Sequence, residues 1–285
     1  MIRDAYFQLF HSDAVEWLRR LPDECLDLVV TDPPYESLEK HRAVGTTTRL
    51  SHSKSSSNEW FEIFPNHRFE EFFSEIVRVL KTDRHFYLFC DAETMFVAKP
   101  IAEKVGLTFW KPLIWDKRRI GMGYHYRARY ECILFFEKGK RRLNDLGIAD
   151  ILEAPRVSTG YPTEKPGSIA ETLIRQSTEP GELVADPFMG SSSTGIAAVL
   201  NDRSFAGNDL SQMAINLAYE RMASAGAQQS EDIIRQINVS NQLSLFSPAS
   251  YLELEAASVE ADLPSSWLAR ERDDSKGPDL EPSLA

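Results

Sequence analysis

The chain has 285 residues, 42% of them hydrophobic, which is enough for one substantial core with an appended segment. It contains no run of eighteen apolar residues and does not begin with a basic segment followed by an apolar one. We therefore expect no membrane span and no export signal, and a cytoplasmic location. The three cysteines lie far apart without a CxxC pair, which argues against a disulfide framework or a metal site.

The distribution of charge matters more than the formal net charge of −11. Residues 228–285 carry eleven acidic side chains against four basic ones, a net of −7, whereas residues 111–142 carry ten basic against three acidic, a net of +7. A basic face of this kind can neutralise phosphates despite the acidic total. We expect a catalytic domain over residues 1–227 and an acidic, partly disordered extension over 228–285.

In chain order, apolar segments typical of strands alternate with segments of helical periodicity. The expected strands are residues 6–13, 26–31, 84–91, 107–117, 129–139, 182–187 and 204–210. The expected helices are residues 16–27 (with a turn), 69–81, 93–106, 168–177, 192–201 and 211–224. This alternation predicts a parallel, doubly wound α/β sheet. The polar, Ser- and Thr-rich residues 36–60 should form a long mobile loop.

The strongest motif is Asp32-Pro33-Pro34-Tyr35, which follows the apolar run at 26–31. In open α/β sheets ligands bind outside the carboxyl ends of strands, so the motif stands where an active site is expected. The amino lone pair of adenine is delocalised into its ring. A carboxylate from Asp32 and the carbonyl of Pro33 can accept the two N–H bonds and turn that lone pair toward a methyl donor, while Tyr35 offers a stacking face for an extruded base. Alternatively, the prolines merely end a strand and Tyr35 packs in the core.

A second motif, at 182–200, reads ELVADPFMGSSSTGIAAVL. A strand ends at Asp186, and a loop of small residues through Gly190 and Ser191 opens a helix whose free N–H groups can meet a ligand. Asp209 lies 19 residues after Gly190, the spacing at which a second strand presents a carboxylate to a ribose diol. The loop lacks a GxGxxG array, which favours a cofactor without phosphates. An ordinary strand-to-helix turn is the alternative.

A third segment, Tyr161-Pro162-Thr163-Glu164-Lys165-Pro166, could bring Lys165 to a carboxylate, or could be a plain proline-rich connector. Together the three segments resemble the S-adenosylmethionine-dependent amino-methyltransferases of DNA in the β arrangement, where the catalytic motif precedes the cofactor motif. The resemblance runs from about Tyr6 to Met222. It implies a permuted Rossmann-like methyltransferase fold with a seven-stranded, mostly parallel sheet and one antiparallel strand, which residues 129–139 could supply.

The resemblance also implies the roles of individual residues. The cofactor is S-adenosyl-L-methionine, no metal is required, and residues 32–35 are catalytic. The cofactor-binding residues are Asp13, Lys165, Asp186, Phe188, Gly190, Ser191, Ser192 and Asp209. Of these, Asp13 would face the cofactor's adenine, Phe188 would pack on the cofactor, and Lys165 would lie near its methionine carboxylate.

Two positions depart from the family pattern. Ser192 stands where the family usually has glycine, and Tyr161 replaces the usual histidine. Neither touches the groups that transfer the methyl, so we expect a changed affinity for the cofactor rather than lost activity. Asp32 as the first catalytic residue, rather than a serine, favours adenine over cytosine within this resemblance.

Cations alternate with aromatic residues in the basic loop at 117–129, a mixture that suits phosphate contact and stacking. We expect this loop to face duplex DNA, the loop at 36–60 to cover the flipped base, and the short region at 139–160 to take part in target recognition. The predicted DNA-binding residues are Arg42, Arg49, Lys117, Arg118, Arg119, His125, Arg127 and Arg129. A solvated loop without a ligand is the alternative.

The extension contains Gln242-Leu243-Ser244-Leu245-Phe246, which resembles the peptide that bacterial proteins insert into the replication sliding clamp. Two leucines and a phenylalanine in a mobile segment can fill an apolar groove of such a partner, or the peptide can dock on its own domain. Relatives in this class often pair, so we also expect a homodimer.

The sequence therefore predicts a site-specific enzyme that transfers a methyl group from S-adenosylmethionine to the exocyclic amino group of adenine in duplex DNA, after flipping the base. It would act at the nucleoid of a bacterium or a phage-infected cell. The alternatives are methylation of cytosine at N4 or of RNA, a catalytically idle DNA-binding regulator of the same fold, and a nicotinamide oxidoreductase, which the missing pyrophosphate loop disfavours.

Overall fold

The computed structural model describes residues 5–37, 62–121, 125–157 and 164–236. The strands are β1 (Tyr6–His11), β2 (Leu26–Thr31), β3 (Leu80–Cys90), β4 (Thr108–Asp116), β5 (Tyr130–Lys138), β6 (Ile151–Glu153), β7 (Leu183–Asp186), β8 (Ser204–Asp209) and β9 (Gln228–Gln229). The helices are α1 (Ala14–Arg20), η3 (Asn66–Arg68, a 3-10 turn), α3 (Phe69–Val79), α4 (Ala92–Lys104), α5 (Gly167–Ser177), α6 (Ser193–Leu200) and α7 (Gln212–Ser224). No helix in these ranges is long and apolar enough to cross a membrane.

The strands form one sheet in the order β6-β4-β5-β3-β2-β7-β8-β1-β9. All seven expected strands are present, and the short strands β6 and β9 extend the sheet at its two edges. β5 runs antiparallel to both β3 and β4, while the other neighbours pair in parallel. The segment expected to supply the antiparallel strand does so.

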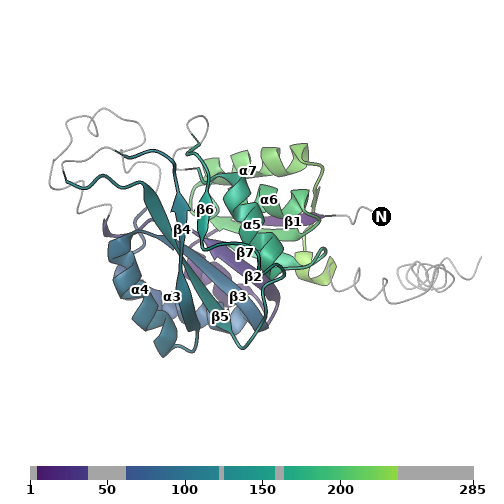
Figure 1. The fold of residues 1–285 in the computed structure, drawn as a ribbon. Coiled ribbons are helices and arrows are strands. Elements are labelled where there is room, and N and C mark those ends of the chain that lie inside the picture. Colours follow the sequence, from purple (N-terminus) through teal and green to yellow (C-terminus); the bar gives the residue numbers. More distant parts are fainter. Residues whose placement is uncertain (1–4, 38–61, 122–124, 158–163, 237–285) are drawn as a thin grey trace, which may run out of the picture. The chain divides into compact units, whose positions relative to one another are not determined.

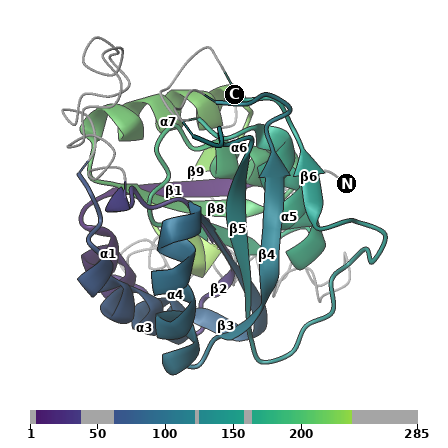
Figure 2. The same cartoon turned by 60° about the vertical axis from the view of Figure 1, so that its left-hand side comes forward.

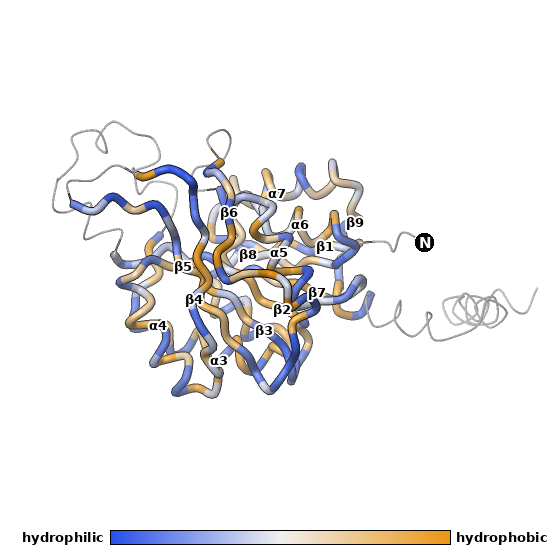
Figure 3. Tube along the Cα trace, viewed as in Figure 1, coloured by the Kyte–Doolittle hydropathy of each residue, from blue (hydrophilic) through white to orange (hydrophobic). Residues whose placement is uncertain are grey.

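Helices cover both faces of the sheet, with α1, α3 and α4 on one side and α5, α6 and α7 on the other (Figures 1 and 2). Because successive side chains of a strand point to opposite faces, Val29 packs with the first helix layer, and Leu28 and Val30 with the second. Burial on both faces explains why the sequence of β2 is almost continuously apolar. Hydrophobic stretches accordingly follow the central strands in Figure 3.

The β2–β7 pair is the topological switch point of the sheet. The chain leaves β2 for β3 by way of α3 on one face, and leaves β7 for β8 by way of α6 on the other face. Crossovers that diverge in this way leave a crevice outside the carboxyl ends of the two strands, where ligands bind in doubly wound sheets. The two strongest sequence motifs begin at these two strand ends.

The compact body extends beyond residue 227, where we expected the catalytic domain to end. β9 pairs with β1, the backbone carbonyl of Glu231 accepts a hydrogen bond of 2.5 Å from the side chain of Gln8, and Ile233 is 2% exposed. Residues 228–236 therefore belong to the folded body.

A buried carboxylate ties the strands together at the end remote from the motifs. Asp27 on β2 is 2% exposed and lies 2.8 Å from the ammonium of Lys81 and 3.0 Å from the guanidinium of Arg84. Its second oxygen accepts a hydrogen bond of 3.0 Å from the backbone of Leu183 on β7. One side chain thus connects β2, β3 and β7.

Replacing this group should destabilise the fold without touching the strand ends that carry the motifs. Asp27→Ala leaves two cations without their buried partner, and we expect the free energy of unfolding to fall by about 3 kcal/mol in urea titrations. Glu103→Ala, which removes an exposed ion pair with Lys99 on α4, should change it by less than about 0.5 kcal/mol. Equal effects of the two changes would contradict this role for Asp27.

Candidate active site

The first two motifs meet through a hydrogen bond between strand ends. Thr31, the last residue of β2, donates to Oδ1 of Asp186, the last residue of β7, at 2.7 Å. The same oxygen accepts the N–H of Phe188 at 3.0 Å, which fixes the turn that follows β7. Asp32, the next residue after Thr31, therefore lies beside the loop predicted to bind the cofactor.

The carboxylate of Asp32 is three-quarters buried, with 25% of its side chain exposed, and contacts two protein groups. Lys165 donates from Nζ to Oδ2, and the Tyr35 hydroxyl donates to Oδ1 at 3.4 Å. Burial raises the pKa of Asp32; the positive charge of Lys165 opposes that rise and the negative charge of Glu131 adds to it. Lys165, predicted to lie near a methionine carboxylate, thus contacts the carboxylate of the catalytic motif.

The two prolines of the motif have different surroundings. The carbonyl of Pro34 accepts the N–H of Phe64 at 2.7 Å, and Tyr35 forms an isolated β-bridge with Phe64. No described residue donates to the carbonyl of Pro33, which leaves it as an acceptor beside Asp32. The Tyr35 ring, predicted to stack on a base, is 8% exposed and packs in the core, while its hydroxyl remains in contact with Asp32.

Lys165 also faces a second pair of charged residues, Glu131 and Lys117. Glu131, the second residue of β5, is 3.5 Å from the Lys165 ammonium through Oε2 and pairs with the Lys117 ammonium through Oε1. Burial favours a raised pKa for Glu131, but the charges of Lys165 and Lys117 hold it below its ordinary value. Lys117 is itself 3% exposed, and burial lowers its pKa. The prediction that Lys117 contacts DNA phosphates is therefore wrong, because its charge is directed inward.

The aromatic ring of Phe188 is held in a cluster that also involves the catalytic motif. Its centroid lies 5.1 Å from that of Phe64 and 5.6 Å from that of Phe72 on α3. The Arg68 guanidinium lies 5.2 Å from the centroid of the Phe64 ring. Phe64 and Arg68 were not predicted as site residues, because no motif marks them and only the folded chain brings them to the strand ends.

The predicted adenine-facing acid, Asp13, is occupied by protein groups. It is the N-cap of α1, accepting the N–H groups of Val15 and Glu16 at 3.0 and 3.2 Å, and it forms two hydrogen bonds of 2.7 and 2.9 Å with Arg68. The hydrogen bond to Arg68, opposed by burial, lowers its pKa. Asp13 thus anchors the turn after β1, and a direct contact with the cofactor remains a prediction.

The end of β8 is connected to the loop after β7. Oδ2 of Asp209 accepts the N–H of Gly190 at 2.9 Å, and burial raises the pKa of this carboxyl. Its neighbour Asn208, 1% exposed, donates from its side chain to the carbonyls of Ser12 and Pro187 at 3.0 and 3.2 Å. The turns after β1, β7 and β8 are therefore fixed to one another. Asn208 has no motif signal and was not predicted.

Ser192 adopts a conformation that favours glycine. It has φ 63° and ψ 42°, in the left-handed region, and is fully buried. Its hydroxyl has no hydrogen-bond partner among the described residues. An added Cβ on Gly195 would lie 2.3 Å from this hydroxyl oxygen and 2.7 Å from the Phe205 ring, so glycine at 195 makes room for both.

A partly buried ion pair connects the segment that bears Lys165 to the predicted cofactor loop. The guanidinium of Arg221 on α7 lies 2.8 Å from Glu164 and donates to the carbonyl of Ser191 at 2.7 Å. The Ser193 hydroxyl donates to the same Glu164 oxygen at 3.3 Å. Lys165 is therefore positioned in two ways: its neighbour Glu164 is anchored by these contacts, and its own ammonium contacts Asp32.

The remaining predicted DNA-binding residues have varied surroundings. Arg118 pairs with Glu153 at 2.8 Å and Arg129 with Asp116 at 2.6 Å, and both arginines stay more than half exposed. The side chains of Arg119, His125 and Arg127 are exposed. The other predicted positions, which are Arg42, Arg49, residues 161–163 and Gln242–Phe246, lie outside the described residues.

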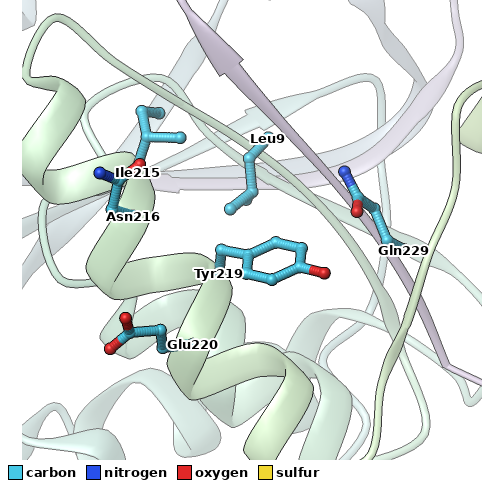
Figure 4. A pocket seen from close by; sticks show the side chains of 6 residues that line it. All are labelled: Leu9, Ile215, Asn216, Tyr219, Glu220 and Gln229. Atoms are coloured by element: carbon cyan, nitrogen blue, oxygen red, sulfur yellow. The ribbon is translucent and has the colours of Figure 1, made fainter.

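A cavity of about 330 Å³ lies elsewhere, between β1, α7 and β9. Figure 4 shows its lining, which consists of Leu9, Ile215, Asn216, Tyr219, Glu220 and Gln229. None of these residues belongs to the motifs, which lie at the strand ends instead.

The residues at the strand ends suit a cofactor that carries a ribose, an amino-acid end and a positive sulfur. Asp209 offers a carboxylate to a diol, and Phe188 offers an aromatic face. The buried, unpartnered hydroxyl of Ser192 in the same loop is a further polar group without a protein partner among the described residues. This donor set fits S-adenosylmethionine.

Comparison with known proteins agrees with this chemistry. A family model described as DNA methylase matches residues 26–220. The chain therefore belongs to the DNA methylase family, and it is a DNA methyltransferase with S-adenosylmethionine as its cofactor. It is 26% identical to the DNA adenine methyltransferase YhdJ of Escherichia coli (strain K12) over 80% of this chain and 86% of that protein.

Solved structures confirm the expected fold class. The structure of M1.HpyAVI in complex with SAM covers 76% of this chain and 99% of its own, with a TM-score of 0.56 and 22% identity. The cytosine-N4-specific PvuII DNA methyltransferase covers 82% of this chain and 95% of its own, with a TM-score of 0.57 and 17% identity. These likenesses establish the fold.

We expect Ser192→Gly to stabilise the protein. The change removes a left-handed non-glycine residue and a buried, unpaired hydroxyl, and these gains exceed the extra backbone entropy of glycine in the unfolded chain. The free energy of unfolding should rise by about 1 kcal/mol in urea titrations. Ser192→Ala, which removes only the hydroxyl, is the matched control and should gain less. A loss of stability in Ser192→Gly would disprove the strain.

Asp186 should make stability depend on pH. Burial raises its pKa from 3.8 to about 7, so its contribution to stability is fully present below pH 3.8 and is lost as the pH rises through 7. Asp186→Asn removes this loss. Its free energy of unfolding should therefore improve relative to the wild type between pH 4 and 8, by up to about 4 kcal/mol. A difference that stays constant with pH would contradict the shift.

Proposed function

We propose that this DNA methyltransferase acts on the exocyclic amino group of adenine in duplex DNA. The observation that carries the proposal is the pairing of an acidic acceptor, Asp32, with the neighbouring Pro33 carbonyl, which has no described donor, at the switch point of the sheet. The printed name of the relative YhdJ, a DNA adenine methyltransferase, supports adenine as the target. Asp32 in place of a serine favours the same base.

When bound, S-adenosylmethionine supplies a methyl group on a positively charged sulfur. Asp32 and the Pro33 carbonyl accept the two N–H bonds of the flipped base, which turns the nitrogen lone pair away from the ring. As the nitrogen gains the methyl group, the methyl–sulfur bond would break with its electron pair staying on the sulfur, which becomes neutral while the nitrogen becomes cationic. The carboxylate of Asp32 would stabilise that charge and accept the N–H proton whose loss gives the neutral methylamino product. The residues act mainly by holding the amino group in place, which lowers the entropic part of the barrier.

Contacts within the protein hold these two acceptors in place. The N–H of Phe64 engages the Pro34 carbonyl, and the Tyr35 hydroxyl contacts Asp32. These contacts limit rotation of the turn that carries both acceptors, so the amino group meets a preorganised pair. The exposed arginines at 118, 119, 127 and 129 are suited to neutralising phosphates beside the site.

Other parts of the function remain predictions. Formation of a homodimer, insertion of Gln242–Phe246 into a sliding clamp, action at the nucleoid in the cytoplasm, and covering of the flipped base by residues 36–60 follow from the sequence alone. We retain a catalytic domain followed by an acidic extension, and a contribution of residues 139–160 to target recognition, as proposals.

The decisive change is Asp32→Asn, which keeps the shape of the side chain but replaces one acceptor oxygen with a donor amide. We expect kcat to fall by about 100-fold or more, while binding of S-adenosylmethionine in calorimetry persists. Transfer of labelled methyl to duplex DNA, followed by digestion to nucleosides, measures both the rate and the target base.

The same assay tests the alternatives. Label recovered in N4-methylcytosine would show that the target base is cytosine rather than adenine. Label found only in RNA would show that the substrate is RNA rather than duplex DNA. A wild-type protein that binds the cofactor but labels no nucleic acid would favour a catalytically idle regulator. Full activity of Asp32→Asn would remove the proposed mechanism.

A further inference from the structure

We propose that Glu131 is a positioning residue for the methyl transfer: together with Lys117 it determines how tightly Lys165 holds the carboxylate of Asp32. The inference rests on the proposed function, because it concerns the availability of Asp32 to the amino group of the base. It assigns a role to strand β5, which carries none of the motifs that identify the site.

The four residues form a row of alternating charge. Asp32 contacts Lys165, Lys165 lies 3.5 Å from Oε2 of Glu131, and the other oxygen of Glu131 contacts Lys117. The exposed fractions are 25% for Asp32, 15% for Lys165, 22% for Glu131 and 3% for Lys117. Because most of the row is withdrawn from water, its members act on one another more strongly than surface charges do.

Lys165 is shared between two acids. Its ammonium touches Asp32 on one side and faces Glu131 on the other, and Oε2 of Glu131 has no hydrogen-bond partner among the described residues. The charge on that oxygen therefore acts mainly on Lys165. Lys117, which pairs with the opposite oxygen and lies 5.1 Å from the Trp115 ring centroid, limits this attraction.

This sharing affects the reaction because Lys165 and a base amino group use the same acceptor. An ammonium held firmly on Oδ2 of Asp32 makes the carboxylate a weaker acceptor for the N–H bonds of the base. Glu131 draws the ammonium away from Asp32 and adds negative charge near the nitrogen that becomes cationic. Lys117 has the opposite effect, since it neutralises Glu131.

The other charged or titratable groups around Asp32 are few in the described residues. They are Tyr35 on its own turn, Cys90 and Asp91 at the end of β3, and Asp186 at the end of β7. Among the residues that the structure describes, only Lys165 brings positive charge into direct contact with Asp32. The negative charge of Glu131 raises the pKa of Asp32, and the positive charge of Lys165 lowers it.

The pH profile of the reaction tests the row of four charged residues, because the two variants should shift its acid limb, where activity rises with pH, in opposite directions. The full-length protein, Glu131→Gln and Lys117→Met are compared in kcat and kcat/KM for methylation of duplex DNA across the acid limb. An ionised Asp32 is needed, so activity rises with pH through its pKa. Glu131→Gln removes a negative charge and should move the acid limb down by about one pH unit, whereas Lys117→Met removes a positive charge and should move it up.

The plateau rates provide a second readout. In Glu131→Gln, Lys165 is left to Asp32 alone, and kcat at pH 8 should fall by about tenfold while calorimetric binding of S-adenosylmethionine changes much less. A residue with a purely structural role would lower kcat without moving the limb. Glu103→Gln, which makes the same chemical change on the exposed face of α4, should leave both quantities at the wild-type values.

The double variant Glu131→Gln, Lys117→Met removes the pair as a unit and should keep the fold if a single variant does not. Its limb should lie below that of the wild type, because Glu131 is nearer to Asp32 than Lys117 is, and above that of Glu131→Gln. Shifts in the same direction for the two single variants, or no shift in the double variant, would overturn the inference. Absence of methylation by the wild type would instead defeat the proposed function.

Discussion

The hydrogen bond from Thr31 to Asp186 joins residues 155 positions apart in the chain, and the candidate site depends on the strand pairing that it completes. β2 and β7 pair in parallel, so their carboxyl ends lie together, and helices leave them toward opposite faces. Without this register the acid of the first motif and the loop of the second would not share a crevice. The fold thus creates the site by aligning two strand ends.

The alignment of the strand ends brings several acidic side chains together in a buried region. Burial raises the pKa values of Asp32, Asp186 and Asp209, because the loss of water disfavours the ionised form of each carboxyl group. The protein offsets this cost unequally: a lysine contacts Asp32, whereas Asp186 and Asp209 receive uncharged donors. Within the described part of the chain, the only one of the three with a cationic partner in contact is therefore the proposed catalytic group, and that partner is itself shared with Glu131.

The sequence predicted all seven main strands, because buried strands have uniform apolar runs and the motifs mark strand ends. The antiparallel position of β5 was implied by the resemblance to the methyltransferase family. It did not predict Phe64, Arg68, Asn208 or Glu131, whose contacts form only between segments distant in the chain. Lys117 was misassigned for a related reason. Neighbouring cations in a sequence look alike, and only the partner opposite, here Glu131 on the next strand, shows which one points inward.

The residues that sequence analysis missed share a function, which is to couple the parts that it identified. The backbone of Phe64 bonds to Pro34 in the turn proposed to be catalytic, and its ring packs on Phe188. Arg68 contacts the Phe64 ring and pairs with Asp13 after β1. A ligand that displaced Phe188 would therefore also displace Phe64, and through it Pro34 and the start of the segment that follows Tyr35. Because these contacts are packed and hydrogen-bonded, the acceptor pair and the cofactor loop should move as one unit.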